Sequence, residues 1–266
     1  MSQINWSYHG ETGIDDWHNF FPAAKGKHQS PIGISSHQTK YDSTLPCLKY
    51  KYNAGATKSV TNNGHSFNVS VDSNESELCG GPLKYRYKMA GFHAHWGLTE
   101  ATGSEHTVDG IPYAGEFHLV HWNSDLFNSM EEAMSQQNGI AVLGVFVRVG
   151  KEHSQIQSLL RNFQKIRFNG DSCAVEGGFD PSCLLPDNIL DYWTYQGSLT
   201  TPPCYETVSW IVFKEPIELS SSQLEIFRTL HISAENQQLP GDNDHMVNNY
   251  RPTQELNGRE VTSTFA

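Results

Sequence analysis

The sequence has little cysteine, few basic residues and no long hydrophobic run, and each shortage excludes a class of protein. The five cysteines are an odd number without a C-x-x-C pair, which argues against a disulfide framework and a cysteine-based zinc finger. Lysine and arginine number 18 against 29 acidic residues, and the formal charge of −11 disfavours binding to nucleic-acid phosphates. The longest apolar run, residues 140–147, is interrupted by Gly144 and is far too short to cross a bilayer.

The beginning of the chain and its composition point to a cytoplasmic globular protein. Residues 1–6 lack the basic stretch and apolar segment of a signal peptide. Of the 266 residues, 37% are hydrophobic, which is enough for a substantial core. No internal repeat, charge block or low-complexity linker divides the chain. We therefore expect one domain over residues 1–266, no membrane span and a cytoplasmic location.

The spacing of apolar residues predicts a mainly β fold. Residues 66–71 alternate polar and apolar side chains, as in a half-buried strand. Further strands are predicted where aromatic and β-branched residues gather, at residues 84–96, 116–122, 140–149 and 206–213. The segment 140–149 is apolar on both faces and should lie centrally in the sheet. Apolar stripes at helical spacing predict amphipathic helices over residues 154–167 and 220–230.

Histidine is abundant, with 13 residues, and it is concentrated on two of the predicted strands. His93 and His95 are two residues apart, so in a strand their side chains share one face, about 7 Å apart along the chain. The segment between His95 and His118 holds four glycines and a proline, enough to turn the chain back beside itself. A lone H-x-H pair is more often structural, whereas a second histidine-bearing strand favours metal binding.

The second strand offers two histidines, and parity distinguishes them. Glu116 and His118 share one face of a strand, while His121 lies on the other. A zinc-ligating histidine usually donates its second N–H to a carboxylate or carbonyl, which selects His118 with Glu116 as its partner. His121 is then a buried structural residue. Three neutral imidazoles leave zinc with an open fourth position, as in catalytic sites.

Seven blocks of sequence, in order along the chain, carry a family resemblance. They are QSPI at 29–32, NNGH at 62–65, FHAHWG at 92–97, GSEHTVD at 103–109, EFHLVHW at 116–122, YWTY at 192–195 and GSLTTPP at 197–203. From Trp6 to about Pro252 the chain resembles the α-class carbonic anhydrases. The resemblance implies a large twisted, mostly antiparallel sheet of about ten strands with short peripheral helices. It also implies a zinc-dependent lyase that hydrates carbon dioxide reversibly to bicarbonate and a proton.

The resemblance assigns the zinc ligands to His93, His95 and His118, the three that parity selects. The nucleophile it implies is zinc-bound hydroxide, carbonic anhydrase being the standard example of zinc lowering the pKa of bound water to about 7. Thr200 and Glu105 correspond to the polar pair that orients this hydroxide.

By the same resemblance, carbon dioxide binds beside the metal and the proton leaves through a histidine. The implied substrate-binding residues are Val120, Val142, Leu199, Thr201, Val208 and Trp210. His65 corresponds to the proton shuttle, and an unperturbed imidazole titrates near pH 6.5. Tyr8, Asn63 and Asn68, again with Thr201, match residues that order the waters of the proton path. Inhibition by sulfonamides and anions and a monomeric state are also expected.

The chain departs from the family pattern at three positions. Gly91 replaces a glutamine that would hydrogen-bond the first zinc ligand, and Ala94 replaces an aromatic residue. Losing such a partner typically lowers metal affinity or activity about 10–100-fold, so we expect weaker zinc retention with activity preserved. Cys204 corresponds to one of the two cysteines that form a disulfide in secreted members of the family. Residues 21–25, where the second cysteine would lie, contain none. The absence of this disulfide agrees with the expected cytoplasmic location.

Two other interpretations remain open. One is a carbonic-anhydrase-related binding domain that keeps the fold without catalysis, since function depends on the site rather than on the fold. The other is an unrelated β-barrel metalloenzyme with an H-x-H site.

Overall fold

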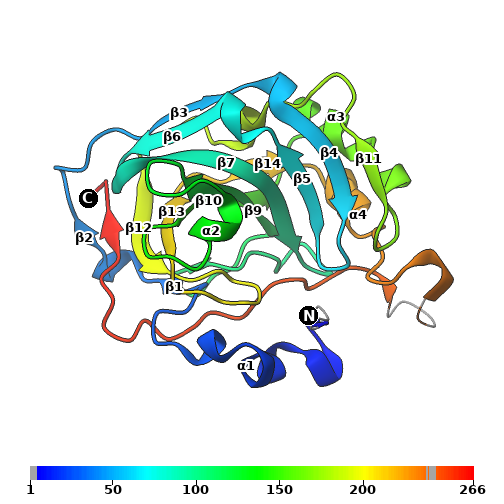
Figure 1. Ribbon diagram of the computed structural model, residues 1–266, viewed down its shortest axis with the longest axis horizontal. Coiled ribbons are helices and arrows are strands. Elements are labelled where there is room, and N and C mark those ends of the chain that lie inside the picture. The colour runs from blue at the N-terminus through cyan, green and yellow to red at the C-terminus, as the bar shows by residue number, and fades with distance from the viewer. Residues whose placement is uncertain (1–4, 238, 240–243) are drawn as a thin grey trace.

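A twisted sheet of thirteen strands forms the centre of the molecule in the computed structural model, which describes residues 5–237, 239 and 244–266 (Figure 1). Ten strands follow one another across it in the order β11-β4-β5-β7-β9-β10-β13-β12-β15-β2. Strand β14 pairs with β10, and β3 pairs with β6, which pairs with β7. Strands β1 and β8 form a separate parallel pair.

The long strands lie in the middle of the sheet and the short ones at its edges. The bounds are β1 Gly33–Ile34, β2 Lys40–Tyr41, β3 Lys49–Tyr52, β4 Thr57–Asn62, β5 Phe67–Val71, β6 Ser76–Gly80, β7 Leu83–Trp96 and β8 Thr107–Val108. They continue with β9 Gly115–Asn123, β10 Ile140–Val149, β11 Ser172–Ala174, β12 Tyr192–Gly197, β13 Val208–Phe213, β14 Ile217–Leu219 and β15 Thr262–Ser263. Each of the five predicted strands is present, with ends shifted by at most two residues.

The sheet is mixed in direction and has more strands than expected. Strand β10 runs antiparallel to β9 but parallel to both β13 and β14. Its first eight residues are buried, and it lies between β9 and β13, as its two apolar faces predicted. Among the strands that the spacing did not predict, β2, β11, β14 and β15 have only two or three residues, which is too short to give an alternating pattern in the sequence.

Helices are short and lie around the sheet (Figure 1). The α-helices are α1 Trp17–Phe20, α2 Met130–Ala133, α3 Ser154–Leu160 and α4 Ser221–Phe227. The helix predicted over 154–167 ends at Leu160 and continues as a 3-10 turn, Phe163–Lys165, although its apolar stripe is buried. Helix α4 begins at a capping box in which Ser220 and Gln223 exchange hydrogen bonds.

Alternation along β10 separates two clusters of buried apolar residues, one on each face of the sheet. Ala141 and Leu143 belong to the larger cluster and Ile140 and Val142 to the smaller one. Since successive side chains of a strand point to opposite faces, the clusters lie on opposite sides. We call them the large core and the small core.

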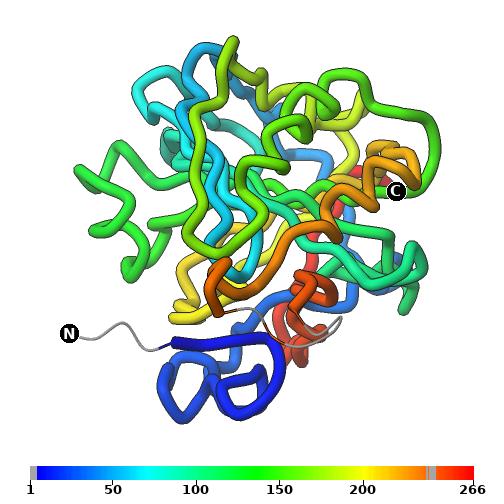
Figure 2. The backbone as a smooth tube through the Cα atoms, turned by 90° about the vertical axis from the view of Figure 1, so that its right-hand side faces the viewer, coloured from blue at the N-terminus to red at the C-terminus, as the bar shows by residue number. Residues whose placement is uncertain are grey.

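The N-terminal segment and the C-terminal tail lie side by side along one edge of the molecule (Figures 1 and 2). Arg259 donates a hydrogen bond to the Gln29 carbonyl, and Asn257 donates one to the carbonyl of Lys27. These contacts tie the two ends of the chain together. Across the described residues, no helix has the length and apolar character needed to span a membrane.

Candidate metal centre

Two neighbouring strands bring three histidines together. His93 and His95 lie on β7 and His118 on β9, and the register pairs His93 with His118. One ring nitrogen of each histidine lies within 4.8 Å of the other two. The His95 Nε2 and His118 Nδ1 atoms are 3.1 Å apart, close to the roughly 3.3 Å expected between two nitrogen ligands of a tetrahedral zinc ion.

Hydrogen bonds on the outer sides of two rings fix which nitrogen carries the proton. His95 Nδ1 lies 2.7 Å from the Asn249 carbonyl oxygen, and His118 Nε2 lies 2.8 Å from Glu116 Oε1. Each of these acceptors requires an N–H donor. Burial lowers the pKa of His95 to about 4 and also lowers the pKa of His118, so both rings are neutral near pH 7. Their inner nitrogens therefore present two lone pairs to each other, which a cation between them satisfies.

The Glu116 carboxylate connects the His118 ring to the segment that contains Glu105 and His106. Its Oε1 also accepts from His106 Nδ1 at 2.7 Å, and its Oε2 accepts the backbone N–H groups of Glu105 and His106 at 2.9 and 2.8 Å. Burial alone would raise the pKa of Glu116, but the interactions with His106 and His118 outweigh it and hold the pKa well below its usual range. Glu116 is therefore an ionised carboxylate that three hydrogen bonds from Glu105 and His106 hold in place and that accepts a fourth from His118.

Glu105 and Thr200 are buried beside the histidines. Glu105 Oε1 accepts the Arg251 backbone N–H at 2.7 Å, while Oε2 lies 3.4 Å from His95 Nε2. Burial raises the pKa of Glu105 to about 7, and the His118 ring, the Arg251 N–H and the Thr200 side chain all oppose the rise. The Thr200 hydroxyl is thus near Glu105, although no hydrogen bond of regular geometry reaches Oε2.

A cleft of about 310 Å³ opens above His93 and His95. Its lining includes nine of the candidate site residues: Tyr8, Asn63, His65, Asn68, His93, His95, Val120, Leu199 and Thr201. The structure therefore brings together two of the candidate metal ligands, the suggested proton path and part of the suggested apolar wall.

The other named residues lie beneath the cleft surface. Val142 pairs with Val120 on one side and with Trp210 on the other, so these three form a row across β9, β10 and β13. Val142, Val208 and Trp210 are buried in the small core, and Val120 and Leu199 pack against it. The Trp210 ring lies 4.8 Å from the His118 ring. The wall is thus a continuous apolar layer of which Val120 and Leu199 face the cleft.

His65 is stacked on Trp6 at the mouth of the cleft. The two ring centroids are 3.6 Å apart and the planes differ by 8°. Burial lowers the pKa of His65 to about 4 in this position. Asn63 holds the turn by accepting the His65 backbone N–H at 3.0 Å, and the Tyr8 ring lies 6.4 Å from the imidazole.

Comparisons with known proteins show the family to which the chain belongs. Residues 12–265 match the family model described as eukaryotic-type carbonic anhydrase. The chain belongs to this family. It is 43% identical over 263 residues to carbonic anhydrase 3 of Homo sapiens, with 98% of both chains covered. It is 44% identical over 267 residues to carbonic anhydrase 1 of Mus musculus, covering 100% of both chains, and 44% identical over 263 residues to carbonic anhydrase 3 of Bos taurus, covering 98% of both.

Family membership makes the chain a carbonic anhydrase, an enzyme that acts on carbon dioxide and bicarbonate. The mainly β architecture, with its large mixed sheet and few short helices, agrees with the fold that the resemblance implied. Family membership does not determine which residues of this chain hold the three histidines in place. Positions 91 and 94 on β7, where the chain departs from the family pattern, bear on this question.

Glycine at position 91 and alanine at position 94 lie in different surroundings on β7. A Cβ atom on Gly91 would lie 2.4 Å from the Val69 carbonyl oxygen of β5, so the close approach of the two strands requires glycine. Glycine at position 91 offers His93 no side-chain partner, and the His93 ring has no hydrogen-bond partner among the described residues. Ala94 is buried in the large core, opposite the histidines, and its carbonyl accepts from the Ser66 hydroxyl at 2.6 Å.

Sequence reasoning missed the supports that come from the ends of the chain. Asn249 supplies the carbonyl for His95, and the backbone N–H of Arg251 holds Glu105. The buried Arg251 guanidinium donates to Gln29 Oε1 at 2.8 Å, and Gln29 Nε2 donates to Glu206 Oε1 at 2.9 Å. Residues 249–251 have no regular secondary structure, so no periodic pattern marks them.

Proposed function

We propose that this chain is a zinc carbonic anhydrase in which His93, His95 and His118 bind the ion. The observation that carries the proposal is the pair of inner nitrogens, His95 Nε2 and His118 Nδ1, 3.1 Å apart with both N–H groups directed outward. Three neutral imidazoles match the donor preference of zinc and leave its fourth position open to the cleft.

When bound, zinc lowers the pKa of a coordinated water to about 7 in this family, which supplies a nucleophile at neutral pH. Glu116 keeps His118 in the tautomer that leaves Nδ1 free. Glu105 lies where it can accept the Thr200 proton, and Thr200 then offers only lone pairs to the group above the histidines. Thr200 would thereby select and orient a group that donates a hydrogen bond to its hydroxyl oxygen.

The apolar layer suits a substrate without charge or dipole. Val120 and Leu199 face the cleft beside His95, with Val142, Val208 and Trp210 behind them. Carbon dioxide would rest against this wall, because the wall offers no polar group that must be desolvated. Thr201, which also lines the cleft, would bind the polar product, bicarbonate.

His65 would carry the proton from the cleft to solvent. Its stacked position holds the imidazole neutral, with a pKa of about 4, whereas a solvated imidazole titrates near 6.5. The shuttle would therefore accept a proton after rotating off Trp6 into the cleft. Tyr8, Asn63, Asn68 and Thr201 would order the connecting waters.

Further parts of the proposal concern the whole chain. All five cysteines are free, including the buried Cys204, which suits a reducing compartment such as the cytoplasm. We propose a single domain over residues 1–266, a monomer, and inhibition by sulfonamides and small anions at the open zinc position.

Stopped-flow carbon dioxide hydration tests the proposal. The chelated protein should be inactive, and adding zinc should restore activity. His118→Ala should remain inactive with zinc, whereas His37→Ala, at an exposed histidine, should behave as wild type. Rates equal to buffer for the zinc-loaded wild type would refute the enzymatic function. Full activity of His118→Ala would refute the ligand assignment.

A further inference from the structure

Asparagine is followed by glycine at four places in the chain, and such pairs are prone to lose the side-chain amide spontaneously. The pairs are residues 63–64, 138–139, 169–170 and 257–258. In this reaction the backbone nitrogen of the glycine attacks the preceding side-chain carbonyl carbon, and glycine has no side chain to obstruct the attack. All four asparagines are exposed. The surroundings of the glycine nitrogen, and not the sequence or the exposure of the asparagine, therefore distinguish the four pairs.

Three of the four glycines already donate their backbone N–H to an acceptor elsewhere in the fold. These bonds run from Gly64 to Asn62 Oδ1, from Gly139 to the Gln136 carbonyl and from Gly170 to the Asn62 carbonyl, each at 2.9 Å. An engaged N–H gives up its proton less readily, and its bond must open before the nitrogen can turn toward the side chain. The fold thus protects these three pairs.

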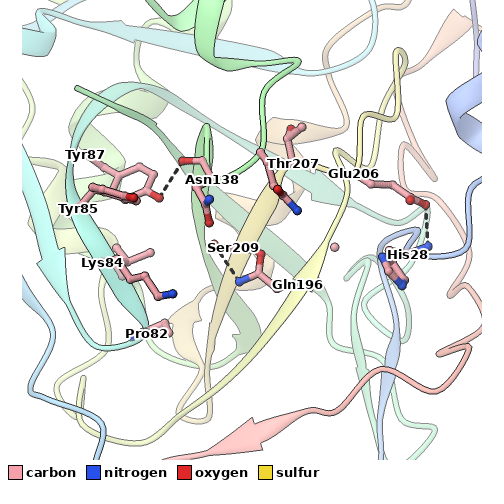
Figure 3. Close-up of a pocket in the computed structure, with 13 residues that line it drawn as sticks. His28, Pro82, Lys84, Tyr85, Tyr87, Asn138, Gln196, Glu206, Thr207 and Ser209 are labelled. Carbon is pink, nitrogen blue, oxygen red and sulfur yellow. Dashed lines mark hydrogen bonds between the residues drawn. The ribbon is translucent and has the colours of Figure 1, made fainter. Parts of the chain in front are cut away.

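Asn138 is the closest counterpart of Asn257, because both have a left-handed backbone, with φ of 58° and 51°. Asn138 lines the cavity of about 500 Å³ drawn in Figure 3, where its carbonyl accepts the Tyr87 hydroxyl at 2.9 Å. The same carbonyl accepts Asn123 Nδ2 at 3.0 Å, and Gly139 is buried. Both the oxygen and the nitrogen of the peptide group that would react are therefore bonded to other parts of the chain.

The peptide group between Asn257 and Gly258 is much less restrained. Arg259 donates its backbone N–H to the Leu256 carbonyl at 3.0 Å and closes a turn whose two central residues have φ of 51° and 79°. The Gly258 N–H has no acceptor within the part of the chain that the structure describes, and a Cβ there would have no atom within 4 Å. The Asn257 side chain makes one exposed bond, from Nδ2 to the Lys27 carbonyl at 3.0 Å. Only this bond has to break before the reaction.

We propose that Asn257 is the residue at which this protein deamidates spontaneously. Once a base has removed the Gly258 amide proton, the nitrogen forms a bond to Asn257 Cγ. The Cγ–Nδ2 bond then breaks, so that ammonia leaves and a cyclic succinimide remains. Water opens the ring at one of its two carbonyls and produces aspartate or isoaspartate. One water is consumed and one ammonia is released, without oxidation or reduction.

The modification acts on the contact between the two ends of the chain. Asn257 Nδ2 is the donor to the Lys27 carbonyl, and the neighbouring Arg259 donates to the Gln29 carbonyl at 2.7 Å. A carboxylate in place of the amide has no N–H and brings a negative charge against the carbonyl oxygen of Lys27. The product therefore holds its C-terminal tail less firmly against residues 27–29.

Peptide mapping of the full-length protein tests the site. The protein is kept in mildly alkaline buffer, digested at acidic pH, and analysed by mass spectrometry with detection of isoaspartate. We expect Asn257 to be converted at least about tenfold faster than each of the other three asparagines, because their glycines need local opening first. In urea, where the fold protects none of them, the four rates should agree within about threefold.

Faster conversion at position 63, 138 or 169 in the folded protein would overturn the proposal. So would the absence of product at Asn257, or the same ratio of rates in urea as in the folded protein. The mapping uses the wild-type chain, so it does not depend on whether a variant folds.

The variant Asn257→Asp tests the consequence, with Asn138→Asp as the matched control. Asn138 is also exposed, left-handed and followed by glycine, but its side chain makes no hydrogen bond with any described residue. Asn257→Asp should lower Tm by about 2–4 °C, and the control should stay within about 1 °C of wild type. A Tm equal to that of the control would refute the loosening of the C-terminal tail.

Discussion

Replacing Gly91 with alanine should lower the stability of the protein. The added Cβ would lie 2.4 Å from the Val69 carbonyl oxygen and 3.5 Å from its carbon. Both atoms belong to backbone in the middle of the sheet, where β5 and β7 are paired at Asn68 with His93, Val69 with Phe92 and Ser70 with Gly91. The contact can be relieved only by moving one strand away from the other.

The size of the effect follows from two opposing contributions. Overpacking that forces a backbone shift costs about 1–3 kcal/mol. Alanine also restricts the unfolded chain, which returns about 0.4–1 kcal/mol. The free energy of unfolding should therefore fall by about 1–2 kcal/mol, and Tm by roughly 2–8 °C, for a chain of this size.

Differential scanning calorimetry measures this change, with Gly55→Ala as the matched control. Gly55 is exposed, and the nearest atom to its added Cβ is Asn53 Oδ1 at 3.4 Å, an ordinary contact. The control should melt within about 1–2 °C of wild type. A Gly91→Ala protein that melts with the control would refute the argument that the strand approach requires glycine.

The same position tests zinc retention. Gly91→Gln introduces the same backbone clash as Gly91→Ala, but it adds an amide that can hydrogen-bond His93. Comparing the two separates the amide from the clash. Zinc should be released to a chelator about 10–100-fold more slowly by Gly91→Gln than by Gly91→Ala. Equal release rates would show that a partner for His93 does not matter in this chain.

Three further results are expected. Glu116→Gln should weaken zinc binding about 10–100-fold, measured by competition with a chromogenic chelator, because a neutral amide holds the His118 N–H less firmly; an unchanged affinity would remove Glu116 from the support of the metal. His65→Ala should slow hydration in weak buffer and recover with added imidazole, and a variant indifferent to buffer would point to another proton exit. His121 is buried, and burial lowers its pKa to about 3. Between a pH of about 6.5 and about 3, His121 is protonated in the unfolded chain but neutral in the folded one. The free energy of unfolding therefore decreases as pH falls from about 6.5 toward 3, by up to about 1.4 kcal/mol per pH unit. His121→Gln should flatten this part of a urea-denaturation pH profile, and parallel profiles would contradict the assignment.

Period-two parity predicted much of the metal centre, because the side on which a strand residue points is a local property. His93, His95 and His118 follow from it, and so does the contact of Glu116 with His118, now seen at 2.8 Å. Parity likewise placed His121 on the other face, where its Nε2 lies 2.9 Å from the Tyr52 hydroxyl.

Other features depend on contacts between distant parts of the chain and had no local pattern. The parallel pairing of β10 with β13 joins segments more than 60 residues apart, and nothing in either segment specifies direction. Glu105 and Thr200 were named only by family resemblance, since each alone has the character of a surface or loop residue. The glycine requirement at position 91 arises from a carbonyl oxygen of another strand, which no reading of β7 could supply.

The supports of the metal centre also set an order of events during synthesis. The three histidines and Glu116 leave the ribosome well before the carbonyl of Asn249 and the N–H of Arg251, which follow them by more than 100 residues. A nascent chain could pair β7 with β9 and gather the imidazoles while His95 still lacks the acceptor that fixes its proton. Because both late contacts come from main-chain atoms, no side-chain substitution at position 249 or 251 deletes either group, apart from proline at position 251, which has no N–H. The finished centre therefore depends on a segment made after all three histidines, and the contacts that complete it belong to the backbone.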